Sequence, residues 1–201
     1  MLLEIAINKA TQLGFNKNRD KGTKYFHCCC FGGKTINRIN ESWKKYISDD
    51  FIVCLWDEYT FDCFGHYFVK DAYENKNWDY VIDYVRLWVM YNFGGVYFDI
   101  DIELLKPIYN LPTNFLSIES GSYKLNLGNG FGVDKENKFI GDILKIYDRK
   151  MKLIWDMRNV IKSSTITTTY FFNKGFDINK NEIHEFLGFT IYPYKIISQK
   201  I

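Results

Sequence analysis

The chain has 201 residues, of which 47% are hydrophobic, 18% aromatic and 25% charged. These proportions are typical of a folded globular protein and exclude disordered and fibrous classes. The formal net charge is only +2, so the sequence predicts no nucleic-acid partner, because phosphate binding needs a concentrated basic surface. It also contains no run of about 18 uncharged apolar residues and therefore predicts no transmembrane segment.

The N-terminal segment predicts a helix, because Leu2, Ala6, Ala10 and Leu13 recur at helical spacing. We interpret it as a packing helix, with a helix that anchors the protein peripherally at a membrane surface as the alternative. The five cysteines, three of them adjacent at 28–30, have neither the even number of a disulfide framework nor the spacing of a zinc site. They are interpreted as reduced core residues of a cytoplasmic protein.

Two continuous apolar runs, residues 24–31 and 51–56, predict buried strands. Gly32 and Gly33 end the first run, and residues 35–46 follow with helical spacing. Strand, helix and strand in this order are typical of a βαβ unit. The sequence therefore predicts an α/β fold with a mainly parallel sheet flanked by helices.

The central segment, residues 78–92, predicts a mostly buried helix, because apolar residues recur every three or four positions on more than one face. Asp83 and Arg86 lie on its charged side, one helical turn apart. The glycine pair at 94–95 predicts the helix end, and residues 96–98 predict a strand.

The second half of the chain predicts shorter elements separated by turns. These are a strand at 114–119, a glycine-rich turn at 126–132, helices at 139–147 and 153–161, and a last strand at 189–194.

Asp99 and Asp101 directly follow the predicted strand at 96–98, and α/β sheets bind ligands at the carboxyl ends of their strands. Two carboxylates this close repel each other unless a cation or a proton intervenes. Such oxygen ligands suit Mg²⁺ or Mn²⁺, with phosphate oxygens and water as further ligands. The alternative is a polar turn after a strand.

Asp83 and Arg86 have two interpretations as well. A mostly buried helix rarely keeps two charged side chains without partners. The pair could bind a polyol, Asp83 by accepting hydroxyl hydrogen bonds and Arg86 by donating to hydroxyl or phosphate oxygens. The alternative is a local salt bridge that contributes only a few tenths of a kcal/mol.

The segment DYVIDYVRLWVMYNFGGVYFDIDIELLKPI, residues 79–108, resembles the family 32 glycosyltransferases, which carry an Asp-X-Asp motif. Upstream, FHCCCFGGK and ESWKKY are similar to the opening strand and first helix of that family. Downstream, LGNGFGVDKENKFI is similar to its asparagine-glycine turn and next helix. The resemblance covers about residues 24–194 and is most specific in the central segment.

The resemblance implies a GT-A fold in residues 24–201, preceded by an N-terminal helical extension in residues 1–23. It implies a nucleotide-sugar donor, a divalent metal ion, usually manganese with magnesium as the alternative, and transfer with retention of anomeric configuration. Asp99 and Asp101 would hold the metal ion and the donor. Asp83 and Arg86 would hold the donor sugar.

Three further residues take expected positions from the same resemblance. Tyr97 would line the donor pocket, and Asn129 would face the reacting sugar. His27 matches a histidine of the opening strand, where we favour a structural role over a ligand role.

The sequence departs from the family pattern at two places. Cys30 stands where relatives usually carry a tryptophan, so stacking on the nucleotide base is not expected from this position. The family's C-terminal segment, with a histidine pair and a tryptophan that help close the metal site, is not found before Ile201, and His184 is no substitute. We therefore expect a donor site that is open to water.

The resulting expectation is a metal-dependent retaining glycosyltransferase of the cytoplasm, acting in capsular or other surface polysaccharide synthesis. Its acceptor would be a glycan or a lipid-linked saccharide. Retention leaves two routes open, front-face attack or a carboxylate nucleophile, for which Glu119 is the candidate. The alternatives are a non-catalytic nucleotide-sugar-binding module and a metal-dependent hydrolase of nucleotide-sugars.

Overall fold

The computed structural model describes residues 1–12, 24–33, 41–119, 124–156, 162–180 and 182–200. Its helices are α1 (Leu2–Gln12), α2 (Glu41–Tyr46), α3 (Tyr67–Glu74), α4 (Trp78–Phe93), η1 (Leu127–Asn129), α5 (Lys138–Asp156) and α6 (Ser163–Phe172). Its strands are β1 (Lys24–Cys29), β2 (Phe51–Trp56), β3 (Gly95–Tyr97), β4 (Ile102–Leu104), β5 (Phe115–Ser117), β6 (Phe131–Val133), β7 (His184–Phe186), β8 (Phe189–Tyr192) and β9 (Ser198–Lys200).

The described strands form a seven-stranded sheet in the order β2-β1-β3-β6-β5-β8-β7. β1 is parallel to β2 and β3, and β5 is parallel to β8. β6 and β7 run antiparallel to their neighbours, which makes the sheet mixed. β4 and β9 form a separate antiparallel pair. The predicted α/β fold is confirmed, and the expected parallel pairing of the first two strands extends over their whole length.

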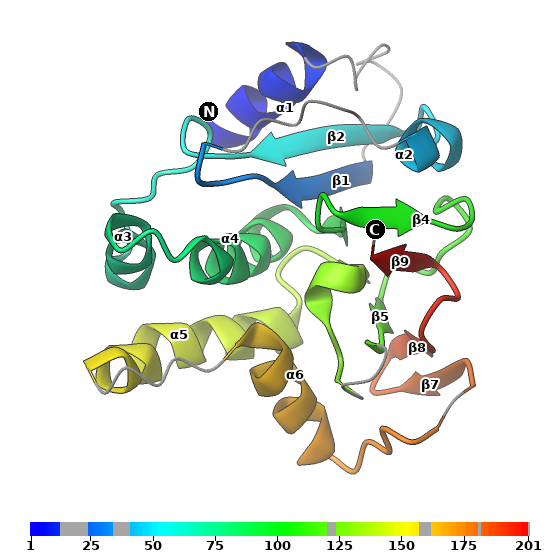
Figure 1. The fold of residues 1–201 in the computed structure, drawn as a ribbon. Coiled ribbons are helices and arrows are strands. Elements are labelled where there is room, and N and C mark those ends of the chain that lie inside the picture. Colours follow the sequence, from blue (N-terminus) through cyan, green and yellow to red (C-terminus); the bar gives the residue numbers. More distant parts are fainter. Residues whose placement is uncertain (13–23, 34–40, 120–123, 157–161, 181, 201) are drawn as a thin grey trace.

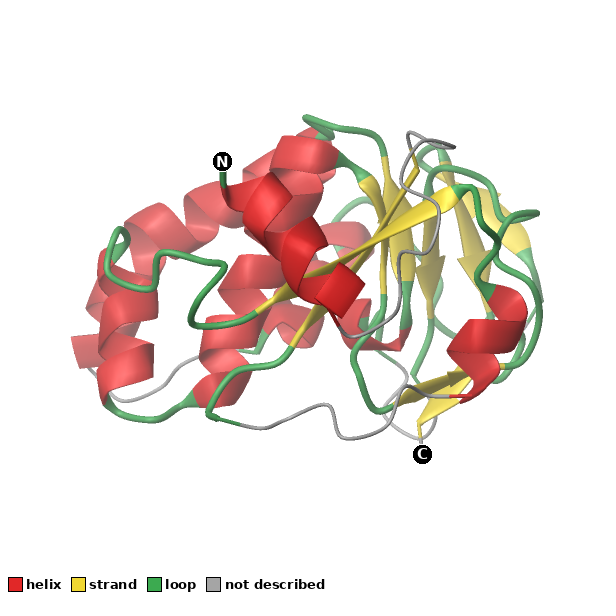
Figure 2. Cartoon of the chain, turned by 90° about the horizontal axis from the view of Figure 1, so that it is seen from above, coloured by secondary structure: helices red, strands yellow, loops and turns green. Residues whose placement is uncertain are grey.

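Helices cover the sheet on both faces (Figures 1 and 2). Side chains of β1 alternate between two buried clusters. Cys29 packs in the cluster that contains Val85 of α4, while Phe26 and Cys28 pack in the cluster that contains Trp43 of α2. Burial on both faces explains why this strand is a continuous apolar run. All five cysteines are buried and free, as expected for reduced core residues.

α1 packs against the edge strand β2. Ala6 and Ala10, two residues of the predicted stripe, are both fully buried. The packing interpretation of this helix is therefore confirmed, and Leu13 lies outside the described residues. α1 belongs to the same packed body as the sheet, and the boundary of an N-terminal extension at residue 23 stays a prediction.

The turn from α4 to β3 brings the two charged motifs together. Gly94 and Gly95 have φ angles of 65° and 107°, a region that favours glycine. A Cβ on Gly95 would overlap the carbonyl oxygen of Tyr25 in the neighbouring strand. The chain therefore reverses tightly after α4, so that β3 enters the sheet beside β1 and places Asp99 next to Arg86.

The second half departs from the sequence predictions. The two helices expected at 139–147 and 153–161 are one helix, α5, as far as the structure describes them. The glycine-rich turn expected at 126–132 contains η1, and its last two residues belong to β6. α3, α6, β4, β6, β7 and β9 were not expected. Of the helix expected at 35–46, the structure describes only α2, because residues 34–40 lie outside the described ranges.

Candidate functional site

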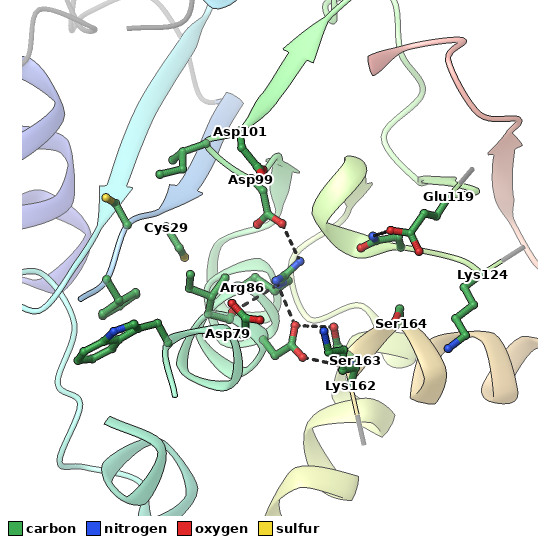
Figure 3. Close-up of a pocket in the computed structure, with 17 residues that line it drawn as sticks. Cys29, Asp79, Arg86, Asp99, Asp101, Glu119, Lys124, Lys162, Ser163 and Ser164 are labelled. Atoms are coloured by element: carbon green, nitrogen blue, oxygen red, sulfur yellow. Dashed lines mark hydrogen bonds and ion pairs between the residues drawn. The ribbon is translucent and has the colours of Figure 1, made fainter. Parts of the chain in front are cut away.

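A pocket of about 430 Å³ lies at the end of β3 (Figure 3). One side consists of the C-terminal end of β1, the N-terminal half of α4 and the Asp-X-Asp motif. The other side consists of the segment around the glycine-rich turn and the start of α6. The described lining residues are Cys29, Cys30, Phe31, Trp78, Asp79, Ile82, Asp83, Arg86, Asp99, Ile100, Asp101, Glu119, Lys124, Asn126, Lys162, Ser163 and Ser164.

Arg86 lies between two carboxylates of the pocket. Its Nη2 is 3.0 Å from Asp83 Oδ1, and its Nη1 is 3.5 Å from Asp99 Oδ2. Burial by itself lowers the pKa of Arg86. The negative charges of Asp99 and Asp83 raise this pKa by more than burial lowers it, so the pKa lies above its ordinary value. The local salt bridge considered from the sequence exists, and it is part of a larger buried network that reaches the Asp-X-Asp motif.

Tyr97 fixes the carboxylate of Asp99 by a hydrogen bond. Its hydroxyl donates to Asp99 Oδ1 at 2.8 Å. Tyr97 is fully buried and is not among the lining residues of the pocket. The guanidinium of Arg86 also stacks over the Tyr97 ring at 5.3 Å. Burial raises the pKa of the Asp99 carboxyl, while Arg86 and Tyr97 act in the opposite direction. Two fixed partners therefore set the orientation of Asp99.

Asp99 and Asp101 supply the carboxylates expected for a metal ion, and both line the pocket. No cluster of three or more His, Cys, Asp or Glu side chains suited to a metal ion occurs in the described ranges. Two carboxylates fit Mg²⁺ or Mn²⁺ when substrate phosphates and water complete the coordination, as is common for Mg²⁺. This pair of carboxylate ligands therefore suits a metal ion that binds together with a phosphate-containing substrate.

The glycine-rich turn packs against the Asp-X-Asp motif. Asn126 lines the pocket, accepts the N–H of Gly128 at 2.8 Å, and donates to Glu119 Oε1 at 2.8 Å. Asn129 lies further along the turn and is not among the described lining residues; its carbonyl accepts a hydrogen bond from the Ser198 hydroxyl. The structure thus brings Glu119 to the pocket and places the backbone of Asn129 against β9.

His27 is fully buried in β1 and does not line the pocket. Its Nε2 is 3.0 Å from the Gly94 carbonyl, and its Nδ1 accepts from Trp56 Nε1 at 3.1 Å. Burial lowers the pKa of His27 to about 4, against a smaller opposing effect of the Gly94 hydrogen bond. The ring is therefore neutral at pH 7, with both nitrogens engaged, which supports the structural role.

Several lining residues were not predicted from the sequence. They are Cys29, Cys30, Phe31, Trp78, Asp79, Ile82, Ile100, Lys124, Lys162, Ser163 and Ser164. The two serines could have been found as a helix-start signal, because serine is favoured at helix N-termini. No signal in the sequence placed that helix start beside Asp83, which is 80 positions earlier.

None of the described helices combines the length and hydrophobicity that crossing a membrane would require. No curated protein matches the chain. Among solved structures, a chain described as PaToxG Glycosyltransferase is similar, with 19% identity, a TM-score of 0.51, and coverage of 87% of this chain and 76% of that one. At this identity the likeness concerns the fold, and the expected α/β fold of the GT-A type is confirmed.

The sequence around the pocket is similar to a known glycosyltransferase region. Residues 33–119, which include Asp83, Arg86, Asp99 and Asp101, match the model of a family described as glycosyltransferase sugar-binding region containing DXD motif. Together with the fold, this match supports a place for the chain among the glycosyltransferase families.

Proposed function

We propose that the protein transfers a sugar from a nucleotide-sugar donor to a glycan or lipid-linked saccharide acceptor. The observation that carries this proposal is the pocket in which Asp99 and Asp101 lie at a strand end, with Arg86 3.5 Å from Asp99. The match of residues 33–119 to a DXD-containing sugar-binding region supports glycosyl transfer in general. We extend this proposal to a family 32 enzyme that acts in capsular polysaccharide synthesis in the cytoplasm.

Asp99 and Asp101 would hold a divalent ion, manganese or magnesium, whose chemistry is to neutralise charge on the leaving diphosphate. Tyr97 and Arg86 keep the Asp99 carboxylate in place before substrate arrives. Such preorganisation lowers the cost of binding, because no side chain has to be ordered at that moment. We assign Arg86 and Asp83 to the donor sugar, and we keep Asn129 as a candidate whose backbone packs at the edge of the site.

Retention of anomeric configuration is part of the proposal. In the front-face route, the acceptor oxygen bonds to the anomeric carbon as the bond from that carbon to the phosphate oxygen breaks, and the acceptor proton moves to the departing phosphate. The alternative route needs a carboxylate nucleophile. Glu119 lines the pocket, and its Oε1 accepts from Asn126, so it remains the candidate for that route.

The experiment is a binding and product assay on the chain of 201 residues. UDP-glucose, UDP-N-acetylglucosamine, UDP-galactose and GDP-mannose are tested by thermal shift with and without Mn²⁺. A ligand at 100 times its Kd adds about 2.7 kcal/mol of stability. Products are then analysed with and without saccharide acceptors. Sugar transfer supports the proposal, hydrolysis alone favours the hydrolase, and binding without turnover favours a non-catalytic module.

A further inference from the structure

The N-terminus of α6 is joined to the carboxylate of Asp83 by two hydrogen bonds. The Ser163 hydroxyl donates to Asp83 Oδ1 at 2.6 Å, and the Ser163 backbone N–H donates to Asp83 Oδ2 at 3.0 Å. Ser163 is 3% exposed and Asp83 is 6% exposed. Hydrogen bonds to an ionised, buried acceptor are stronger than neutral ones. This contact therefore fixes the two side chains relative to each other.

Asp83 keeps about one acceptor position for a further donor, such as a hydroxyl group of the sugar. A carboxylate offers about four lone-pair positions, and three are engaged, by Arg86 Nη2, the Ser163 hydroxyl and the Ser163 N–H. Arg86 Nη2 and the Ser163 hydroxyl share the same oxygen, Oδ1. The orientation of Asp83 is thus set by α6, and Asp83 in turn orients the guanidinium of Arg86.

We propose that Ser163 is a positioning residue for the donor sugar: it holds Asp83 so that Arg86 presents its remaining donors to the sugar. This inference rests on the proposed function and extends the site to a segment outside the matched residues 33–119. α6 thereby contributes to a site whose other charged side chains come mainly from α4 and from the segment after β3.

α6 has other attachments, so removal of the Ser163 hydroxyl is expected to leave the helix in place. Thr168 Oγ1 accepts the backbone N–H of Leu125 at 3.0 Å, and Lys124 donates to Thr165 Oγ1 at 3.1 Å. Phe171, near the end of α6, is fully buried in the core cluster of α4 and α5. A loss of function in a hydroxyl-deletion variant would therefore report on Asp83 rather than on detachment of α6.

The test compares Ser163→Ala with Ser163→Thr, which keeps a hydroxyl, and with Thr169→Ala, a control at an exposed position of the same helix. Affinities are measured with Mn²⁺ for the panel nucleotide-sugar that the wild-type protein binds best and for the matching nucleoside diphosphate. Loss of one charge-assisted contact predicts about tenfold weaker nucleotide-sugar binding in Ser163→Ala. Affinity for the diphosphate stays unchanged, Ser163→Thr recovers most of the loss, and Thr169→Ala matches the wild type.

Equal weakening for both ligands, or no weakening for either, would overturn the positioning role. A double-mutant cycle between Ser163→Ala and Asp83→Asn, measured by unfolding, tests the contact without any ligand. Coupling of about fivefold or more in the unfolding equilibrium constant is expected for contacting residues. If the wild-type protein binds no nucleotide-sugar while this coupling is present, the proposed function fails and the contact remains. If the coupling is absent, the positioning role fails by itself.

Discussion

The backbone N–H of Asp99 donates to the carbonyl oxygen of Gly128 at 3.0 Å. The approach is close enough that a Cβ on Gly128 would overlap Asp99 Oδ2 and would lie 2.9 Å from Arg86 Nη1. The glycine-rich turn therefore forms the surface against which the Asp-X-Asp motif rests. A side chain at this position would occupy the space of the Asp99 carboxylate.

Gly128→Ala is expected to displace Asp99 and Arg86 and to weaken Mn²⁺-dependent nucleotide binding by at least about tenfold. Overpacking of a buried site costs about 1–3 kcal/mol of folding stability, so the protein should still fold. The measurements are thermal unfolding and nucleotide titration. Gly141→Ala is the matched control, since a Cβ on Gly141 of α5 would lie 2.9 Å from Cε2 of Tyr91 and so adds a close contact away from the pocket. If Gly128→Ala binds nucleotide with Mn²⁺ as tightly as the wild-type protein, the position of Asp99 against Gly128 is not required for binding.

β2 and α4, in the first half of the fold, were predictable because they are long and mostly buried. β2 has the predicted bounds, and α4 extends one residue beyond its predicted end. Both carry patterns that are locally complete: a continuous apolar run for a strand with both faces covered, and apolar positions at helical spacing. The Asp-X-Asp motif followed from the same reasoning, since it directly succeeds a predicted strand.

The second half was harder because its elements depend on distant partners. β4 and β9 have three residues each and pair with each other across about half the chain. α6 has the sequence SSTITTTYFF, which has no single polar face and many β-branched residues. Its position beside Asp83 and the meeting of Arg86 with Asp99 are tertiary contacts, which periodicity does not encode.

Asp101→Asn is expected to abolish the Mn²⁺-dependent part of nucleotide binding and to leave the fold intact. Asp101 lines the pocket, and the amide removes one of the two carboxylates that offer hard oxygen ligands. The measurement is the thermal shift with nucleotide, with and without Mn²⁺. Glu103→Gln serves as the control, because Glu103 is a nearby carboxylate that pairs with Gln199 and does not line the pocket. Full metal-dependent stabilisation of Asp101→Asn would remove Asp101 from the proposed metal site.

Arg86→Lys is expected to lose nearly as much activity as Arg86→Ala. One planar guanidinium contacts Asp83 at 3.0 Å and Asp99 at 3.5 Å through different nitrogens, and a single ammonium group does not reproduce this fork. Stability should separate the two variants. Arg86→Ala leaves the buried carboxylate of Asp83 without its cation and should cost about 3–5 kcal/mol, while lysine should recover part of that. Wild-type rates in Arg86→Lys would assign Arg86 to a purely structural role.

The stability of the protein should depend on pH through the buried ring of His27. The pKa of His27 is about 4 in the folded protein, below the ordinary value of 6.5, so between these pH values the unfolded chain binds a proton that the folded protein does not. The free energy of unfolding should therefore fall as the pH drops from about 6.5 to 4, by up to about 1.4 kcal/mol per pH unit for this one group.

The test measures denaturant unfolding of the wild-type protein across this pH range and compares it with His27→Gln, which lacks the titrating ring. The variant should be less stable at pH 7, because Trp56 and Gly94 lose their partner, and its stability should depend less on pH. Parallel pH profiles of the two proteins would show that the buried ring does not control acid stability.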